Sequence, residues 1–332
     1  MLSQVQNLYP KGMWWFKSLK TESAETLDQH YIMDNVRGNS MYGFPWDGTT
    51  GITDGAIRTY TEQDHQCVGW CWSAPEAWTG TTNYVANSGY RNTDAGFSMW
   101  QYNGNGVRGN TTSHGLSSAP QFILIQALGT SSGFSPASAV YHHQQDQTNS
   151  SNPAAFPNIN YRLRIESGTV TGADAANWAS TAHTDTLVNL GESTALNASG
   201  RTYQAYAWHE VEGYSRFGRW TGLESSQTTS ADGPYIHCGF KPAFVLCKGI
   251  GAAEGWVIRD TARNLTNPAV KHLTTSLAQQ STSSFEIDIV ANGFKIRTGD
   301  GTFNYAPSGA YIFCAWAESP INPLYGAQPN AR

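Results

Sequence analysis

The chain has 332 residues and a formal net charge of -5, and only 14% of its residues are charged, against roughly 25% in typical soluble domains. Long amphipathic helices need charged residues on their solvent-facing side, and a nucleic-acid partner needs clustered basic residues, so both are disfavoured. No apolar run is long enough to span a membrane, and the N-terminus lacks the basic and apolar regions of a secretory signal. The 12 Trp, 16 Tyr and 13 Phe, set among Thr and Val, predict an all-β protein.

Three kinds of strand recur along the chain in the same order. An apolar strand that closes on a polar residue comes early in each copy, at residues 13–17, 122–126 and 244–248. A strand of small and aromatic residues ending in Trp comes late in each copy, at residues 68–72, 204–208 and 312–316. Between them, residues 30–37 align with residues 256–263, and the middle copy offers only residues 139–142. Recurrence in a fixed order predicts three diverged copies of one β unit.

Two features distinguish the second and third copies from the first. Their late strand is introduced by an Asn, a Ser-Gly pair and a Tyr: Asn197, Ser199-Gly200 and Tyr203, then Asn304, Ser308-Gly309 and Tyr311. A lead-in strand also opens each of them, at residues 97–102 and 217–222, and the first copy lacks it. We therefore expect a truncated N-terminal unit at residues 1–95, a middle unit with an insertion at 96–216, and a C-terminal unit at 217–332.

The pattern of apolar residues predicts the type of β architecture. Continuous apolar runs such as residues 123–125 are typical of strands buried on both faces, whereas the alternating residues 285–289 predict a half-buried strand. The turn at 291–293 then predicts a hairpin with residues 294–297. Together these strands favour tandem jelly-roll-like β-sandwich units. Helix is limited to short turns near residues 23–29 and 173–179.

The five cysteines are an odd number and contain no CxxC pair. Most of them lie in apolar strand-like runs, where a free thiol behaves as a small hydrophobic residue. We therefore expect buried free thiols in a protein that folds in a reducing cytoplasm.

The sequence predicts no enzyme active site, because Asp, Glu and His are thinly spread and no fingerprint for a nucleotide or a nucleophile is present. Glu210 and Glu318 each follow a repeated Trp by two residues. This position favours a hydrogen bond at a strand end, and a catalytic acid would require a burial that sequence cannot show. No cofactor is expected.

Two further patterns contain residues that could form an ion pair or a metal site. Asp34 and Asp260 precede an arginine by three residues, Arg37 and Arg263, and this spacing favours a structural clasp that holds a turn. The adjacent His142-His143 pair could suggest a metal ion. Neighbouring side chains on a strand point to opposite faces, however, and no further ligands are spaced to complete a site, so no metal is expected.

Aromatic residues are the best candidates for binding. The repeated Trp72, Trp208 and Trp316 lie in strands of small residues, which favours packing in the core. Aromatic residues in polar loops are candidate contacts for a glycan or a protein, although they could equally anchor loops or subunits. These candidates are Trp46, Trp78, Tyr84, Tyr90, Trp178 and Tyr325.

Several stretches carry a family resemblance that covers nearly the whole chain: residues 12–17, 34–38, 95–98, 197–200, 207–218, 232–235, 239–245 and 292–297. They resemble the tandem β-domain proteins encoded by marine tailed phages, especially cyanophages, which are labelled tail-fibre-like or virion structural proteins. The chain departs from this pattern at residues 130–160. The resemblance implies a part of the virion, assembled in the cytoplasm of the host bacterium, and transfers no catalytic residue or cofactor.

Three functions are compatible with these observations. The first is a fibre or spike component that contacts other virion proteins, forms a homotrimer and binds a receptor such as a cell-surface polysaccharide, because symmetric copies increase avidity. The second is a decoration or cement protein on the capsid, without a receptor role. The third and least favoured is a polysaccharide depolymerase, which needs a groove with two carboxylates about 5–10 Å apart.

Overall fold

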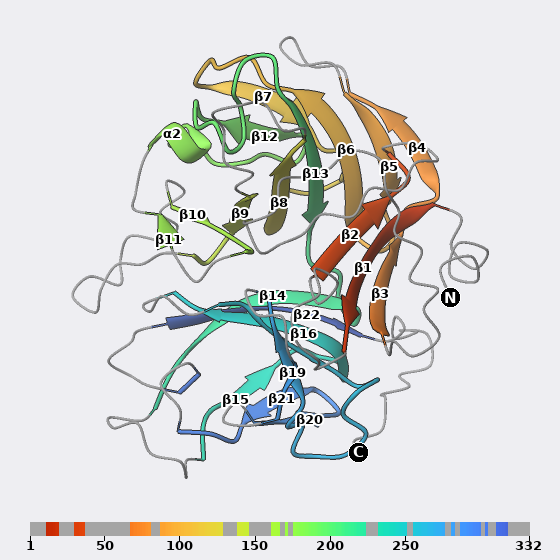
Figure 1. Cartoon of the computed structure of the whole chain (residues 1–332), viewed down its shortest axis with the longest axis vertical. Coiled ribbons are helices and arrows are strands. Elements are labelled where there is room, and N and C mark those ends of the chain that lie inside the picture. The colour runs from red at the N-terminus through yellow and green to blue at the C-terminus, as the bar shows by residue number, and fades with distance from the viewer. Residues whose placement is uncertain are drawn as a thin grey trace. The chain divides into compact units, whose positions relative to one another are not determined.

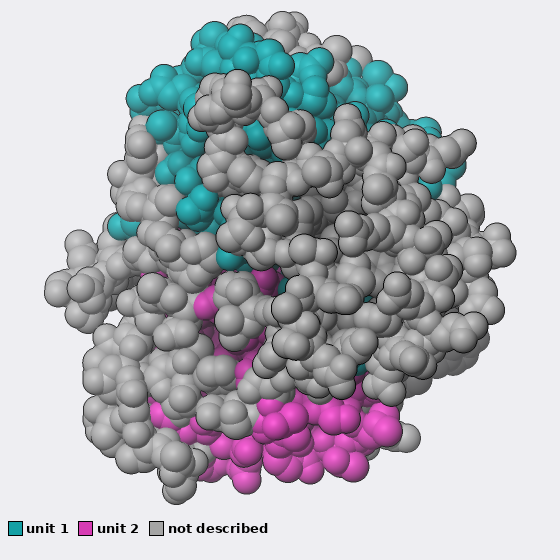
Figure 2. Space-filling model, in the orientation of Figure 1, with its two compact units in different colours: residues 1–141, 159–166, 171–209 teal, residues 142–158, 167–170, 210–332 magenta. Residues whose placement is uncertain are grey.

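The computed structural model describes residues 11–19, 30–36, 67–80, 87–128, 138–145, 161–166, 170–171, 175–223, 232–250, 255–275, 280–282, 286–299, 303–304 and 310–317. The chain divides into two compact units, shown in teal and magenta in Figure 2. Unit 1 comprises residues 1–141, 159–166 and 171–209, and unit 2 comprises residues 142–158, 167–170 and 210–332. The prediction of an all-β protein is confirmed, since strands dominate the described residues of both units.

Unit 1 contains three sheets (Figure 1). The strands that belong to it wholly or in part are β1 (Gly12–Ser18), β2 (His30–Asp34), β3 (Cys67–Ser73), β4 (Glu76–Thr79), β5 (Ser88–Asn92), β6 (Phe97–Asn103), β7 (Asn110–Ser113), β8 (Phe122–Ala127), β9 (Ser138–His142), β10 (Arg162–Leu163), β11 (Val170–Thr171), β12 (Leu187–Leu190) and β13 (Thr202–Trp208). They form an eight-stranded sheet in the order β11-β10-β9-β8-β13-β6-β5-β4, a three-stranded sheet β2-β1-β3, and a two-stranded sheet β12-β7.

Unit 2 contains two sheets. Its strands are β14 (Ser215–Thr221), β15 (Tyr235–His237), β16 (Pro242–Gly249), β17 (Val257–Asp260), β18 (His272–Thr274), β19 (Gln280–Ser281), β20 (Ile287–Val290), β21 (Gly293–Ile296) and β22 (Ala310–Ala317). The larger sheet has the order β14-β22-β16-β17-β18-β19, and the smaller has the order β15-β21-β20. The predicted hairpin is confirmed, because β20 and β21 pair antiparallel with Ile287 opposite Ile296.

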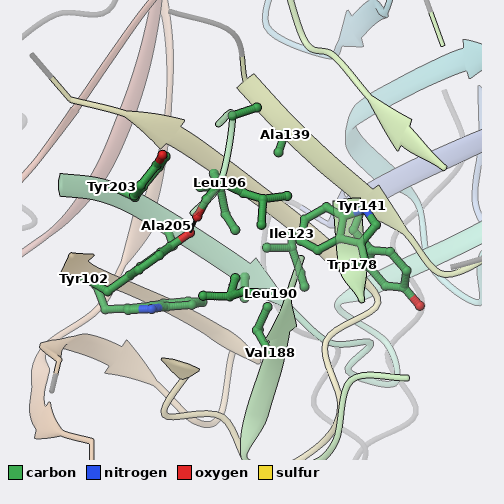
Figure 3. Packing of buried hydrophobic residues seen from close by; sticks show 14 of the residues in the cluster. Tyr102, Ile123, Ala139, Tyr141, Trp178, Val188, Leu190, Leu196, Tyr203 and Ala205 are labelled. Carbon is green, nitrogen blue, oxygen red and sulfur yellow. Dashed lines mark hydrogen bonds between the residues drawn. The ribbon is translucent and has the colours of Figure 1, made fainter. Parts of the chain in front are cut away.

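The core of unit 1 lies between its eight-stranded and two-stranded sheets. Tyr203, Ala205 and Ala207 alternate along β13 and project into this core. Val188 and Leu190 of β12 belong to the same core, and Figure 3 shows both within this cluster of buried side chains. Because side chains alternate between the faces of a strand, a β13 sequence of small and aromatic residues supplies one complete row of this core.

The opposite face of the eight-stranded sheet is also buried. Tyr206 and Trp208 project from β13 on this side, and both are at most 2% exposed. The Tyr206 hydroxyl donates a 2.7 Å hydrogen bond to Oδ2 of Asp34 on β2, and the Trp208 ring meets Trp72 of β3 edge-on at 5.8 Å. The sheet β2-β1-β3 therefore covers this face, and β13 is buried on both sides, as its sequence of apolar residues requires.

Unit 2 is built in the same way around its own core. Tyr311, Phe313 and Ala315 of β22 form the central row, and the smaller sheet contributes Phe294 and Ile296. The Trp220 ring stacks on Tyr311 at 5.1 Å with 17° between the ring planes. Each unit thus contains a two-sheet β-sandwich, in which the buried rows of two sheets pack face to face.

The three sequence copies have the same pairing register. In each, the first residue of the early apolar strand lies opposite the Trp that ends the late strand: Met13 opposite Trp72, Phe122 opposite Trp208 and Phe244 opposite Trp316. The sheet orders β2-β1-β3, β9-β8-β13 and β17-β16-β22 are equivalent. Asp34 also lies opposite Met13 as Asp260 lies opposite Phe244. The alignment made from sequence therefore matches the alignment of the hydrogen-bonded ladders.

The lead-in strand completes the second and third copies only. β6 pairs with β13 and β14 pairs with β22, and Phe97 and Ser215 occupy the equivalent position opposite the repeated Trp. The third lead-in strand thus begins at Ser215, slightly before the expected residue 217. The expected boundary near residue 95 falls between β5 and β6, which are paired neighbours. The structure consequently places β4 and β5 in the same sheet as the strands of the middle copy.

The Asn, Ser-Gly and Tyr motif builds a clasp at one end of each complete copy. Asn197 is fully buried, and its Oδ1 accepts a 3.0 Å hydrogen bond from the backbone N–H of Asn105. Its Nδ2 donates to the carbonyl oxygens of Gly191 at 2.8 Å and Val107 at 3.1 Å. Asn197 therefore holds the chain after β6 against the chain before β13.

Asn304 makes one equivalent contact in unit 2. Its Oδ1 accepts a 2.9 Å hydrogen bond from the N–H of Leu223. Leu223 lies three residues after Trp220, just as Asn105 lies three residues after Tyr102. Tyr102 and Trp220 also donate to the carbonyl just before the Asn, at Leu196 and Phe303. Nδ2 of Asn304, by contrast, has no hydrogen-bond acceptor among the described residues. The motif therefore has a structural role in the fold.

The remaining sequence predictions about structure have mixed outcomes. Of the two expected helical turns, the second corresponds to α2 (Ala175–Trp178), and residues 23–29 lie outside the described part of the chain. Cys238, Cys247 and Cys314 are buried free thiols, as expected, and Cys71 is half-buried and free. Burial raises the pKa of the Cys247 thiol to about 12, so it remains protonated and behaves as an apolar side chain.

Candidate functional site

The structure places two of the predicted contact residues inside the core. Trp78 is 8% exposed and Trp178 is fully buried. The Trp178 indole donates to the Tyr161 carbonyl at 2.9 Å, and its ring meets Tyr141 edge-on at 5.7 Å. Buried rings cannot serve as ligand contacts at the surface, so Trp78 and Trp178 fit the alternative that such aromatic residues anchor the surrounding chain. Trp46, Tyr84 and Tyr325 lie outside the described residues.

Tyr90 is the remaining candidate from sequence. It lies on β5 and is half-buried. The ammonium group of Lys11 lies 4.5 Å from the centre of its ring, an arrangement that attracts the cation to the electron-rich ring face. One face of Tyr90 is thus occupied by the protein itself, which makes it a poor platform for a ligand.

The predicted Asp–Arg clasp is confirmed in the third copy. Asp260 accepts the backbone N–H of Arg263 at 2.8 Å and its Nε at 2.6 Å, and both side chains are buried. In the first copy Asp34 accepts the N–H of Val36 at 2.9 Å and the hydroxyl of Tyr206. Arg37 lies outside the described residues. The repeated Asp therefore accepts a backbone N–H of the turn that follows it in both copies.

Glu210 and the two adjacent histidines also have structural partners. Glu210 forms a partly exposed ion pair with Arg216 at 3.3 Å, and Glu318 lies outside the described residues. The two histidine rings do come together, with centroids 5.2 Å apart, because β9 ends at His142 and His143 lies in the following turn. Their Nε2 atoms bond the carbonyl oxygens of Phe313 and Phe217.

These hydrogen bonds occupy ring nitrogens of both histidines that could otherwise bind a metal ion. A ring nitrogen that bonds a carbonyl oxygen must carry its proton and cannot ligate an ion. Nδ1 of His142 in turn accepts the N–H of Gln144 at 3.1 Å. Within the described ranges, no group of three or more His, Cys, Asp or Glu side chains is arranged to hold a metal ion. The helices in the same ranges include none long and apolar enough to cross a membrane.

A polar and aromatic surface that sequence reasoning did not select lies on the small sheet of unit 2. Along β15, Ile236 is buried while Tyr235 and His237 are exposed, with Tyr235 at 48%. The neighbouring β21 buries Phe294 and Ile296 in the core. Side chains alternate between the two faces of a strand, so Tyr235, His237 and Lys295 share the outward face. We call this surface, with Asp232, Asp288 and Arg297, the β15–β21–β20 face.

An ion-pair network organises the β15–β21–β20 face. Asp232 contacts Lys295 at 3.1 Å and Arg297 at 2.8 Å, and Arg297 also reaches Asp288 at 3.3 Å. The hydrogen bond from Lys295 is the main reason that the pKa of the Asp232 carboxyl is lowered. Asp232 is therefore ionised at neutral pH and serves as a hydrogen-bond acceptor.

The aromatic part of the face is accessible. The ring centroids of Tyr235 and His237 lie 6.4 Å apart, with 67° between the ring planes, and Tyr235 lies directly opposite Lys295 in the ladder. An exposed ring beside fixed carboxylate, ammonium and guanidinium groups can stack on an apolar surface while these groups bond hydroxyls. The signal available from sequence was the alternation of Tyr235-Ile236-His237 with Phe294-Lys295-Ile296-Arg297, which places polar residues of two strands on one face.

The fold and this surface define a class: an all-β protein of tandem, internally repeated sandwiches with an exposed polar-aromatic sheet face. Residues 15–320 match a family described as a domain of unknown function, DUF7483, and the chain belongs to that family. The match spans both units. No curated protein matches the chain, and no solved structure does.

Proposed function

We propose that this protein is a structural component of a tailed-phage virion, a fibre or spike part that binds a glycan on the host cell surface. The resemblance to marine-phage tail proteins supports the virion assignment. The β15–β21–β20 face supports the binding role and is the observation on which it depends. A surface tyrosine beside pre-ordered charged groups suits a hydroxyl-rich ligand better than an apolar one.

The same face argues against a depolymerase. Glycosidic cleavage needs one carboxylic acid whose pKa is raised so that it can donate a proton. Asp232 has a lowered pKa because Lys295 bonds its ionised form, and Asp288 is held by Arg297. Two carboxylates fixed as ion-pair acceptors supply binding and not general acid catalysis.

The proposal includes the assembly in which the protein acts. A homotrimer attached to other virion proteins presents three copies of the face, and simultaneous contacts raise the apparent affinity for a repeated polysaccharide. The alternative is a decoration protein on the capsid surface. Density for this chain on intact particles separates the two: a few copies at the tail support the fibre or spike, and hundreds over the head replace it with decoration.

Binding is tested with host-cell polysaccharide immobilised on a sensor and with the purified protein. We expect Tyr235→Ala to weaken binding by about tenfold or more, since truncating an aromatic residue at a binding hot spot costs about 2 kcal/mol or more. Tyr90→Ala is the matched control, because that ring lies in unit 1 and carries Lys11 on one face. Equal loss in both variants, or no loss in Tyr235→Ala with unchanged thermal stability, contradicts the assignment of the face.

A further inference from the structure

The first copy has an edge strand where the other two copies have a paired strand. β3 forms the end of the sheet β2-β1-β3, whereas its counterparts β13 and β22 lie between two neighbours. In those copies the extra neighbour is the lead-in strand, β6 or β14. The same side of β3 has no paired strand in the described part of the chain.

The hydrogen-bonding pattern shows which residues of β3 face this open side. Ala74 N–H donates to the Lys11 carbonyl at 3.0 Å, continuing the ladder in which β3 pairs with β1. Backbone groups of an antiparallel strand point alternately to one neighbour and the other. Val68, Trp70 and Trp72 therefore direct their N–H and C=O groups to β1. Gly69 and Cys71 direct theirs away from it.

The complete copies confirm this geometry. In the second copy, His209 N–H donates to the Gly96 carbonyl at 2.9 Å and Gly104 N–H donates to the Arg201 carbonyl at 2.7 Å. These bonds flank the ladder between β13 and β6, so Ala205 and Ala207 bond the lead-in strand. Gly69 and Cys71 occupy the same positions in the first copy. They lie opposite Phe16 and Trp14 of β1, just as Ala205 and Ala207 lie opposite Ile125 and Ile123 of β8.

The first copy differs from the other two in how exposed the residues at these positions are. Gly69 is exposed and Cys71 is half-buried, whereas Ala205, Ala207 and Ala315 are fully buried. An exposed strand edge with unpaired backbone groups is a template for another strand, and proteins normally protect it with charged residues, proline or a covering segment. The sequence of β3, Cys-Val-Gly-Trp-Cys-Trp-Ser, contains no charge and no proline.

We infer that the open edge of β3 accepts an antiparallel strand from a different polypeptide, which takes the position of the missing lead-in strand. Both lead-in strands of this chain are already paired, β6 with β13 and β14 with β22. A second copy of the chain therefore has no spare strand of this kind among its described residues. β-strand addition gives affinity through main-chain hydrogen bonds and specificity through alternate side chains.

The complete copies also indicate the chemistry of the donated strand. β6 and β14 each place an aromatic residue, Tyr102 and Trp220 respectively, opposite one position of the late strand. That position lies five residues before the repeated Trp. We expect an aromatic residue at the matching place, opposite residue 67. In the proposed setting the donor is a neighbouring virion protein, but the inference depends on the sheet edge alone and survives if the virion proposal fails.

A peptide copied from β14, residues 213–222, is the probe, because Arg216 and Arg219 keep it soluble. Amide hydrogen exchange of the full-length protein, resolved at Gly69 and Cys71, is the readout. In the native pair, Ala317 N–H donates to the Tyr214 carbonyl at 2.8 Å, so Gly218 faces its partner strand and Arg219 faces away. A peptide N-methylated at Gly218 thus loses a bonding group, and one N-methylated at Arg219 is the matched control.

We expect the unmodified and Arg219-methylated peptides to slow exchange at Gly69 and Cys71 by about tenfold or more, as pairing protects amides. The Gly218-methylated peptide should leave exchange unchanged. Without peptide, exchange at these two amides should not depend on protein concentration. Protection that increases with protein concentration would assign the edge to a second copy and overturn the inference. Protection at every concentration without peptide, or an equal effect of all three peptides, would overturn it as well.

Discussion

Replacing the buried Asn197 with alanine tests whether the repeated Asn is a structural clasp. The side chain makes three hydrogen bonds, to the N–H of Asn105 and the carbonyl oxygens of Gly191 and Val107. Each buried bond contributes about 1 kcal/mol net, so we expect Asn197→Ala to destabilise unit 1 by about 3 kcal/mol. For a unit of this size, that loss lowers Tm by roughly 6–12 °C.

The equivalent Asn304 provides an internal comparison. It accepts one hydrogen bond, from Leu223 N–H, and its amide nitrogen has no acceptor among the described residues. Asn304→Ala should therefore cost about 1 kcal/mol, roughly a third of the effect of Asn197→Ala. The two substitutions are the same chemically, so their difference reports the number of hydrogen bonds and not the loss of an amide group as such.

Differential scanning calorimetry is the assay, because two units can unfold in separate transitions that a single spectroscopic melt would merge. Asn103→Ala serves as the control, since its side chain accepts a hydrogen bond from the Thr202 hydroxyl at an exposed position and its loss should change stability by less than about 0.5 kcal/mol. If Asn197→Ala were no more destabilising than Asn103→Ala, the reasoning that a buried clasp joins the two loops would be refuted.

Three further predictions follow from buried groups. Asp260→Ala should cost about 3–5 kcal/mol in urea denaturation, because it leaves the Arg263 guanidinium buried without its carboxylate; a cost below 1 kcal/mol would show that the pair contributes little. Burial lowers the pKa of His114 to about 4 and of His183 to about 3, below the ordinary value of 6.5. At these two sites the unfolded chain therefore binds more protons below pH 6.5, so their contribution to stability is constant above that pH and becomes unfavourable as pH drops towards 4. Melting curves between pH 4.5 and 7.5 check this, and His114→Gln should flatten the decline; an unchanged slope would contradict the assignment. Trp178→Ala should cost about 3–5 kcal/mol as a core truncation, whereas Tyr90→Ala should shift Tm only slightly.

Much of the fold could be predicted from sequence because it depends on local alternation and repetition. The apolar runs of β8 and β16 predict strands buried on both faces, and the repeated Trp lies at the last or next-to-last residue of the late strand in each copy. Register then follows, since moving a strand by one residue would turn its whole apolar row to the wrong face. The Asp260–Arg263 clasp was also predictable, because three residues span a single turn.

Contacts made across the fold were decided only by the tertiary structure. Trp178 and Tyr235 both lie outside long apolar runs of the sequence, yet one is fully buried and the other is 48% exposed. The difference arises because Trp178 faces the core from α2, whereas Tyr235 lies on the outward side of β15. Likewise, the absence of a lead-in strand in the first copy is a sequence observation, but only the pairing of β1 with β3 shows that Gly69 and Cys71 direct their backbone groups to an open edge. Sequence periodicity specifies which residues share a face of a strand, and packing between sheets determines which face is buried.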